Sequence, residues 1–467
     1  MTDSRLGRSA FTRVQGVVLG LLVLLVLGVM GAMGALRPWI TPDTEGYLAS
    51  RGWPTMLAVE RPPFYRWLLE ALTIGGAAPG LLAVGQVALY LGAAAWLLRC
   101  LSVLGLPGRA VLAVGITLAL ANVLLLMANW AHPEVPAIAF ALCALGASLR
   151  TMLGLRFSCR LAAIAVVAGG AAYLLRPSFL PLIFAFPLVG LLWRMAAFQP
   201  ARPARAILLV VLLLLPFLAT ASLRLVVVRD FNIVSFGGFQ MSGLAALALA
   251  PEVLPRLPPE ARQLAENVLA ARMAAEAEGR IIGIPANSSG TRSFASAALG
   301  YFDVLARTHD DVLYGIVRLQ KQDGEDWVAF NARMQSWSLA VILAAPDRYA
   351  VWVVGASSRL AGRALATNLP FVLGTIALLA LIPLTWLRRL KTDPPTAISD
   401  GISPVAALSL LALGWLAATA PLIVLTTFPA SRYIDTAALL LAAPVWFLVL
   451  ERVWLVQGST QPKRPHP

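Results

Sequence analysis

Long apolar runs dominate this chain and predict helices that cross a membrane. Runs rich in Leu, Val and Ala recur along the sequence, many of them about 20 residues long, which is the length of helix that spans a bilayer. Backbone amides in hydrocarbon must be hydrogen-bonded within their own segment, so each run should be helical. We therefore predict an all-α polytopic membrane protein with about ten transmembrane helices, at residues 14–36, 80–98, 110–129, 135–149, 161–175, 179–193, 206–223, 366–387, 404–427 and 437–455.

The connections between these runs alternate in charge. The outer turns 130–134, 174–178 and 428–436 hold at most one arginine each, whereas the opposite connections hold several basic residues. Basic connections face the cytoplasm in membrane proteins, so both termini are predicted to be cytoplasmic. The basic residues of the inner connections are Arg99 and Arg109; Arg150, Arg156 and Arg160; Arg194, Arg202 and Arg205; and Arg388, Arg389 and Lys391.

This topology divides the chain into an N-terminal membrane module and a smaller C-terminal one. Residues 1–223 contain seven predicted spans and a first outer loop at 37–79, and residues 366–456 contain the last three spans, before a cytoplasmic tail at 457–467. Residues 224–365 are left as an extracytoplasmic segment that is long enough to form a small, mostly helical domain.

The sequence predicts the local structure of four stretches in the outer segments. Residues 257–278 are rich in helix formers after a Pro-Pro start, and residues 232–243 are glycine-rich, which suits a tight loop. Residues 64–75 and 334–358 are apolar but interrupted by charged residues, so both are expected to be outer-face interfacial helices or, for 334–358, a hairpin.

Composition supports a membrane protein and argues against a nucleic-acid-binding protein. The chain is 59% hydrophobic and 13% charged, against roughly 25% charged for soluble domains. Its net charge of +14 comes largely from arginines that flank apolar runs, so we expect membrane lipids and no nucleic acid as partners. The three cysteines fall at the predicted inner ends of spans, so no disulfide is expected in the outer segment.

Ionisable residues are nearly absent from the predicted spans and gather on the outer side. A charged side chain in mid-bilayer usually marks an ion or proton path, and the spans offer none. This argues against an ion-coupled transporter and places any chemistry at the outer membrane surface.

The first outer cluster is Pro42-Asp43-Thr44-Glu45, directly after the first predicted span. Carboxylates two residues apart can share a divalent cation such as Mg²⁺ or Mn²⁺, or divide the roles of base and ligand. The simpler interpretation is a helix N-terminus with acids in its first turn. Arg61 and Tyr65 follow in a Pro-Pro stretch, where Arg61 could instead anchor a lipid headgroup.

Three further outer sites carry charged or aromatic groups. Each has a simple alternative, because turn carboxylates are commonly solvated and arginines snorkel to lipid phosphate. Together, however, outer-surface arginines and carboxylates suit a reaction on a phosphate-linked lipid, since arginine binds phosphate in bidentate fashion. These sites are His132 with Glu134, Arg176 before Pro177, and Arg432 with Tyr433.

The order of these motifs resembles the GT-C superfamily of polytopic glycosyltransferases, in its bacterial branch near protein O-mannosyltransferases and lipid A aminoarabinose transferase. The likeness covers residues 14–195 and extends more weakly over the C-terminal third. One departure is the acidic motif, which reads Asp-Thr-Glu here, whereas close bacterial relatives have adjacent acids.

The resemblance implies an inverting transfer from a polyprenyl-phosphate-linked sugar to a lipid, glycan or protein, at the outer face of the bacterial inner membrane. It places the proposed base at Asp43, with Glu45 completing the paired acids, the second-loop acid at Glu134 and the Arg-Pro position at Arg176. Glu45 or Glu134 would hold the sugar, the acceptor or a divalent ion. Arg61 and Arg432 would join Arg176 in stabilising the lipid phosphate, and Tyr65, His132 and Tyr433 complete the expected substrate-binding set.

Two other classes of function remain open at this point. A lipid or glycan transporter predicts polar groups along a path through the spans and usually an internal repeat, and the sequence shows neither. A non-catalytic membrane scaffold, with residues 224–365 as a docking domain, predicts that Asp43 and Glu134 are dispensable.

Overall fold

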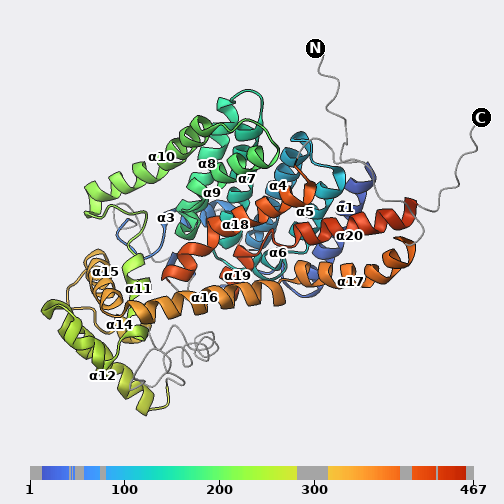
Figure 1. The fold of residues 1–467 in the computed structure, drawn as a ribbon. Helices are drawn as coiled ribbons and strands as arrows, with labels where there is room; N and C mark the ends of the chain where they lie inside the picture. The colour runs from blue at the N-terminus through green and yellow to red at the C-terminus, as the bar shows by residue number, and fades with distance from the viewer. Residues whose placement is uncertain are drawn as a thin grey trace, which may run out of the picture.

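A computed structural model describes residues 13–40, 44, 46–47, 57–73, 80–280, 314–389, 402–426 and 430–458. This part of the chain is helical, and its only β contact is an isolated bridge between Trp39 and Trp130. Figure 1 shows two groups of helices, a large bundle and a smaller group beyond the ends of α10 and α18. The predicted all-α class is confirmed.

Seven of the ten predicted spans coincide with helical segments long and apolar enough to cross a membrane. The chain is therefore a multi-pass membrane protein. The seven are α1 (Arg13–Ala32), α4 (Leu81–Val103), α5 with α6 (Gly108–Ala119, Asn122–Met127), α7 (Glu134–Leu153), η2 with α9 (Pro177–Phe179, Leu182–Ala196), α10 (Pro203–Val228) and α18 (Pro404–Thr426).

The other three predicted spans also fall on helices, but none of the three has a long enough apolar stretch within the residues whose side chains the structure describes. They are α8 (Cys159–Leu175), α17 (Leu369–Arg389) and α20 (Ala443–Gly458). Within α17 the apolar stretch identified is Leu369–Ile382. The count of ten therefore stays a prediction.

Helix α7 lies at the centre of the bundle because small residues let its neighbours approach. It packs against α4, α8 and α9 and is buried along most of its length. A Cβ at Gly146 would lie 3.1 Å from the Cys100 sulfur on α4, and one at Gly190 of α9 would lie 2.6 Å from the Met152 side chain. By contrast, α1 and α10 expose most of their apolar side chains, as expected for helices that face lipid.

The smaller group has a hydrophobic core of its own, centred on Phe239, Phe330 and Trp337. Its α12 confirms the helix predicted at 257–278, and α10 extends to Val228, a few residues into the predicted extracytoplasmic segment. The elements of the group are α11 (Gly237–Ala248), η3 (Pro251–Arg256), α12 (Pro259–Ala277), α14 (Gly315–Arg318), α15 (Trp327–Ala344) and α16 (Pro346–Ala366).

The tight loop predicted at 232–243 is wrong in its second half, because α11 begins at Gly237. A Cβ at Gly238 would lie 2.1 Å from the Asn331 carbonyl oxygen on α15. The glycine is therefore required by close helix packing and not by a turn.

Both stretches predicted to be interfacial are helical. Residues 63–72 form α3 (Pro63–Leu72), while α15 and α16 meet at Ala345 with a bend of 99°. Pro346 starts α16, as its missing N–H and fixed φ allow at the first position of a helix. The predicted break is confirmed, although α16 continues to Ala366, beyond the predicted end.

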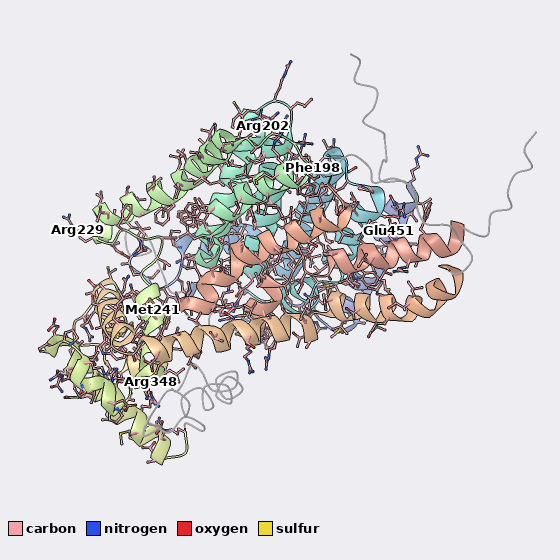
Figure 2. All side chains as sticks on the ribbon, viewed as in Figure 1. Phe198, Arg202, Arg229, Met241, Arg348 and Glu451 are labelled. Atoms are coloured by element: carbon pink, nitrogen blue, oxygen red, sulfur yellow. The ribbon has the colours of Figure 1, made fainter. Side chains whose placement is uncertain are left out.

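Arginines anchor the bundle at the end predicted to face the cytoplasm. Arg109 pairs with Glu451 at 2.7 Å and lies over the Trp454 ring. Arg202 and Arg205 each donate to the Gly154 carbonyl at 2.7 Å, which ties α10 to the end of α7. Figure 2 shows Arg202 and Arg348 at opposite sides of the molecule.

Candidate functional site

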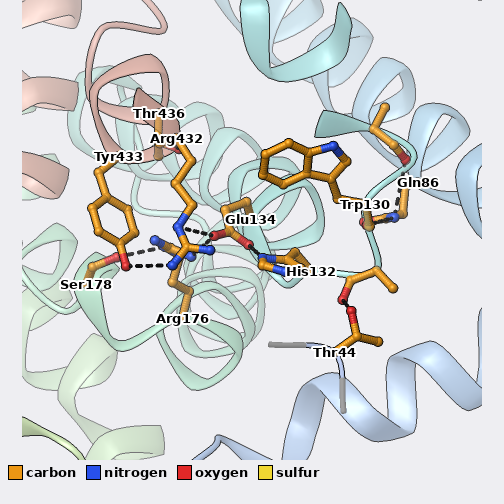
Figure 3. Close-up of polar contacts among 12 residues, drawn as sticks. Thr44, Gln86, Trp130, His132, Glu134, Arg176, Ser178, Arg432, Tyr433 and Thr436 are labelled. Carbon is orange, nitrogen blue, oxygen red and sulfur yellow. Dashed lines mark hydrogen bonds and ion pairs between the residues drawn. The ribbon is translucent and has the colours of Figure 1, made fainter. Parts of the chain in front are cut away.

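The first outer loop is bound to the turn between α6 and α7. The Trp39 amide donates to the Asn129 carbonyl at 2.8 Å, and the Ala131 amide donates back to Trp39 at 3.1 Å. Thr44, the central residue of the Asp-Thr-Glu motif, is fully buried and donates its hydroxyl to the Ala131 carbonyl at 3.1 Å. Two motifs separated by some 90 residues of sequence therefore meet (Figure 3).

Glu134 opens α7 and is the centre of a charged cluster. Its side chain is only 3% exposed and forms an ion pair with Arg176, which is 12% exposed. The Arg432 Nε lies 3.9 Å from the same carboxylate oxygen, and the His132 Nδ1 lies 3.4 Å from the other. The alternative of a solvated turn carboxylate is wrong for Glu134.

Local sequence explains how Arg176 reaches this position. It ends α8 in an extended conformation, φ −143° and ψ 101°, because a residue before proline is disfavoured in the helical region. Its Nε donates to the Ser178 hydroxyl at 3.1 Å, and its guanidinium lies 4.8 Å from the centre of the Tyr433 ring.

Arg432 approaches the same carboxylate from the first turn of α19 (Ser431–Ala437). Its guanidinium lies 5.0 Å from the Tyr433 ring centre and donates to the Tyr433 hydroxyl at 3.2 Å. Tyr433 therefore contacts both guanidinium groups. Since one carboxylate faces two arginines, the cluster has an excess of positive charge, which favours the binding of an additional anion.

Arg61 and Tyr65 flank this cluster. The Arg61 guanidinium lies 5.6 Å from the Tyr47 ring centre and 5.1 Å from that of Phe236. Tyr65 is fully buried on α3, and its hydroxyl has no hydrogen-bond partner among the described residues. Burial, assisted by Tyr47 and Glu134, raises the pKa of Tyr65 well above its usual value, so its hydroxyl stays a neutral donor.

A cavity of about 290 Å³ opens beside these residues. We call it the arginine cavity, after Arg61 and Arg176 in its wall. One part of its wall is polar and includes Glu60, Arg61, Arg176, Ser178 and Tyr433. Another part is apolar and includes residues of α10, of α18 and of the turn before α9. The apolar residues are Leu180, Phe217, Leu422 and Ile423.

The structure thus brings together most of the predicted site residues it describes. His132, Glu134, Arg176, Arg432 and Tyr433 form one contact network, and Arg61 lies across the cavity from it. Asp43 and Glu45 lie outside the described residues. Glu134, His132 and Arg432 do not line the cavity, so Glu134 is connected to it through Arg176.

Sequence reasoning missed several residues of the site. Ser178 stands two positions after Arg176, where a hydroxyl could have been noticed as a local partner. Phe236, Asn232 and Thr426 also line the cavity, but they come from stretches without a recognisable motif.

A bound cation is not supported at Glu134. The described residues contain no group of three or more His, Cys, Asp or Glu side chains that could hold a metal ion. The two guanidinium groups beside Glu134 would also repel a divalent cation.

Comparison of the chain with protein-family models, with curated proteins and with solved structures found no match.

Proposed function

We propose that this membrane protein is an inverting glycosyltransferase that takes a sugar from a polyprenyl-phosphate donor at the outer face of a bacterial inner membrane. The acceptor would be a lipid, a glycan or a protein, as in the GT-C superfamily. One observation carries the proposal. Arg61 and Arg176 line the same cavity as Phe217, Leu422 and Ile423, which belong to two candidate membrane spans. A ligand with an anionic head and a long apolar tail matches such a wall.

The arginines would hold the phosphate as a preorganised electrostatic site. Glu134 and Tyr433 fix the guanidinium groups of Arg176 and Arg432 before a ligand arrives. Fixed charges in a site shielded from water stabilise a developing negative charge without reorganisation. In this account Glu134 is a positioning residue that acts through the arginines.

Asp43 would accept the proton from the acceptor hydroxyl as that oxygen attacks the anomeric carbon. The bond from this carbon to the phosphate oxygen then breaks, and the lipid phosphate leaves with the electron pair. A positioned base contributes about 100- to 10,000-fold to the rate. The hydrogen bond of Thr44 to Ala131 supports this assignment, because it holds the centre of the motif against the turn that precedes Glu134.

Tyr65 and Glu45 complete the proposed site. Tyr65 is fully buried and does not line the cavity, so its role would be to support the ring of Tyr47, which does line it. Glu45 would hold the sugar or the acceptor. The mechanism routes no step through Mg²⁺ or Mn²⁺, since the charges around Glu134 disfavour a cation there.

The test is the variant Asp43→Asn at normal membrane levels, with the exposed Asp323→Asn as the matched control. Each is expressed in a strain that lacks the gene, and envelope lipids and glycans are analysed by mass spectrometry. We expect at least a 100-fold loss of transfer for Asp43→Asn and none for Asp323→Asn. Retained transfer by Asp43→Asn would overturn the assignment of the base.

A further inference from the structure

A second hollow is lined by α12 and α15, in the smaller group of helices. It has a volume of about 680 Å³ and is bordered by Leu319, Gln320 and Gln322, which follow α14. It shares no lining residue with the arginine cavity, so it is a separate feature of the molecule. We call it the amide groove.

Carboxamide side chains dominate the polar wall of the amide groove. Gln263 and Asn267 stand one turn apart on α12 and hydrogen-bond to each other at 3.3 Å. Gln320 and Gln322 border the groove, and Ser336 of α15 adds a hydroxyl. Each carboxamide offers both donors and an acceptor, which matches the hydroxyl groups of a carbohydrate.

The groove is close to neutral. Arg333 lines it, but its guanidinium pairs with both oxygens of Glu325, at 2.8 and 2.7 Å. The other lining charge is Glu260, which is exposed in the first turn of α12. An anionic lipid headgroup would therefore find no unpaired cation among the lining residues of the groove.

One buried donor in the wall has no partner. Trp337 lines the groove and is only 3% exposed, and its indole N–H has no hydrogen-bond partner among the described residues. The indole nitrogen itself is buried from solvent, so Trp337 adds aromatic surface to the wall and not a hydrogen bond to a ligand. Leu264 and Leu319 supply the apolar contacts that the C–H face of a sugar ring requires.

We propose that the amide groove binds a neutral oligosaccharide. The proposal concerns binding alone and does not depend on the transfer reaction proposed above. A peptide would also use carboxamides, but its carboxylates would find no unpaired cation among the lining residues of the groove, which favours the neutral carbohydrate.

Binding is measured on the full chain in detergent by saturation-transfer NMR, with maltohexaose, chitohexaose and a mannohexaose as probes. We expect at least one of them to receive saturation. The double variant Gln263→Ala/Asn267→Ala should weaken its binding about tenfold, because two hydrogen bonds are lost. Gln199→Ala, an exposed carboxamide in the turn after α9, is the matched control and should leave binding unchanged.

A second variant covers the case in which other groups compensate for the two amides. Ser336→Trp places a bulky side chain at an exposed lining position and should block the groove without disturbing the core. Absence of binding by all three probes would overturn the proposal. So would binding that neither Gln263→Ala/Asn267→Ala nor Ser336→Trp weakens, or displacement of the sugar by an unrelated neutral peptide.

Discussion

Glu134 and Arg176 form a buried ion pair that joins the first turn of α7 to the end of α8. Arg432 approaches the same carboxylate from α19, so one acid holds two arginines from distant parts of the sequence. Removing the acid leaves both cations without their counter-charge, whereas removing one arginine leaves the other in place. Loss of Glu134 should therefore lower the stability of the protein more than loss of one of the arginines.

Glu134→Gln should therefore lower the free energy of unfolding by about 3–5 kcal/mol, as breaking a buried pair does. The measurement is the apparent unfolding midpoint in detergent. Glu70→Gln is the control, because Glu70 pairs with Arg66 at 2.9 Å on the exposed side of α3 with a side chain 47% exposed, and such pairs contribute little. Equal shifts for the two variants would contradict the buried pair.

Adding Arg176→Gln to Glu134→Gln extends this test. The double variant should be less destabilised than the sum of the two single variants, because the second change removes a cation that the first left unpaired. Strict additivity would show that Glu134 and Arg176 do not interact.

Thr44→Val should damage transfer more than it damages folding. Valine has nearly the same shape but cannot donate to the Ala131 carbonyl, which costs about 1 kcal/mol and loosens the Asp-Thr-Glu motif from the turn. We expect a loss of transfer of about tenfold or more for a misplaced catalytic group. Thr117→Val is the control, since this buried threonine bonds only within α5, to Ala113. Equal transfer activity in the two variants would contradict a positioning role for Thr44.

Gly238→Ala should destabilise the packing of α11 against α15. The added methyl group would lie 2.1 Å from a backbone oxygen, which cannot move aside as a flexible side chain can. The expected cost is about 1–3 kcal/mol, as in other overpacked contacts. The neighbouring Gly237→Ala has open space at its Cβ and should be neutral in the same thermal assay. A neutral Gly238→Ala would contradict the close approach.

Asp435 should make stability depend on pH. Burial raises the pKa of Asp435 to about 6 from its ordinary 3.8, against the lowering effect of the hydrogen bond from Asn122. A raised pKa means that the folded state holds its proton more tightly. The group therefore costs nothing below pH 3.8, costs more as pH rises toward 6, and exerts its full penalty above that value.

Asp435→Asn keeps an acceptor for Asn122 and removes this penalty. The variant should be more stable than the parent protein at pH 8, by up to about 3 kcal/mol, and the difference should vanish near pH 4. Unfolding midpoints of both proteins between pH 4 and pH 8 measure it. A constant difference across this range would show that Asp435 does not titrate as described.

The sequence predicts the apolar helices well because lipid imposes a strong constraint on them. Seven predicted spans lie on helices that qualify as spans, and the break at Pro346 follows from the chemistry of proline. The sequence predicts the helices of the smaller group less well. The glycines at 237 and 238 suit a loop when read alone, and only the approach of α15 explains why a glycine is needed at 238.

The candidate site could likewise be predicted only in part from the sequence. Arg176, Arg432 and Glu134 could be selected from their outer position and their residue type. Their contact could not, because it depends on how α7, α8 and α19 pack. The burial of Glu134 also changes its expected role, from a group that touches the sugar to one that holds the arginines.

The central claim is that the arginine cavity serves transfer from a lipid-phosphate sugar. Mass spectrometry of lipid-linked sugars and envelope glycans, in a strain that lacks the gene, tests it most directly. We predict that one polyprenyl-phosphate sugar accumulates and that its sugar disappears from one acceptor. The wild-type gene should restore both, and Arg176→Ala at normal membrane levels should restore neither. An unchanged profile in the deletion strain, or full restoration by Arg176→Ala, would contradict the account.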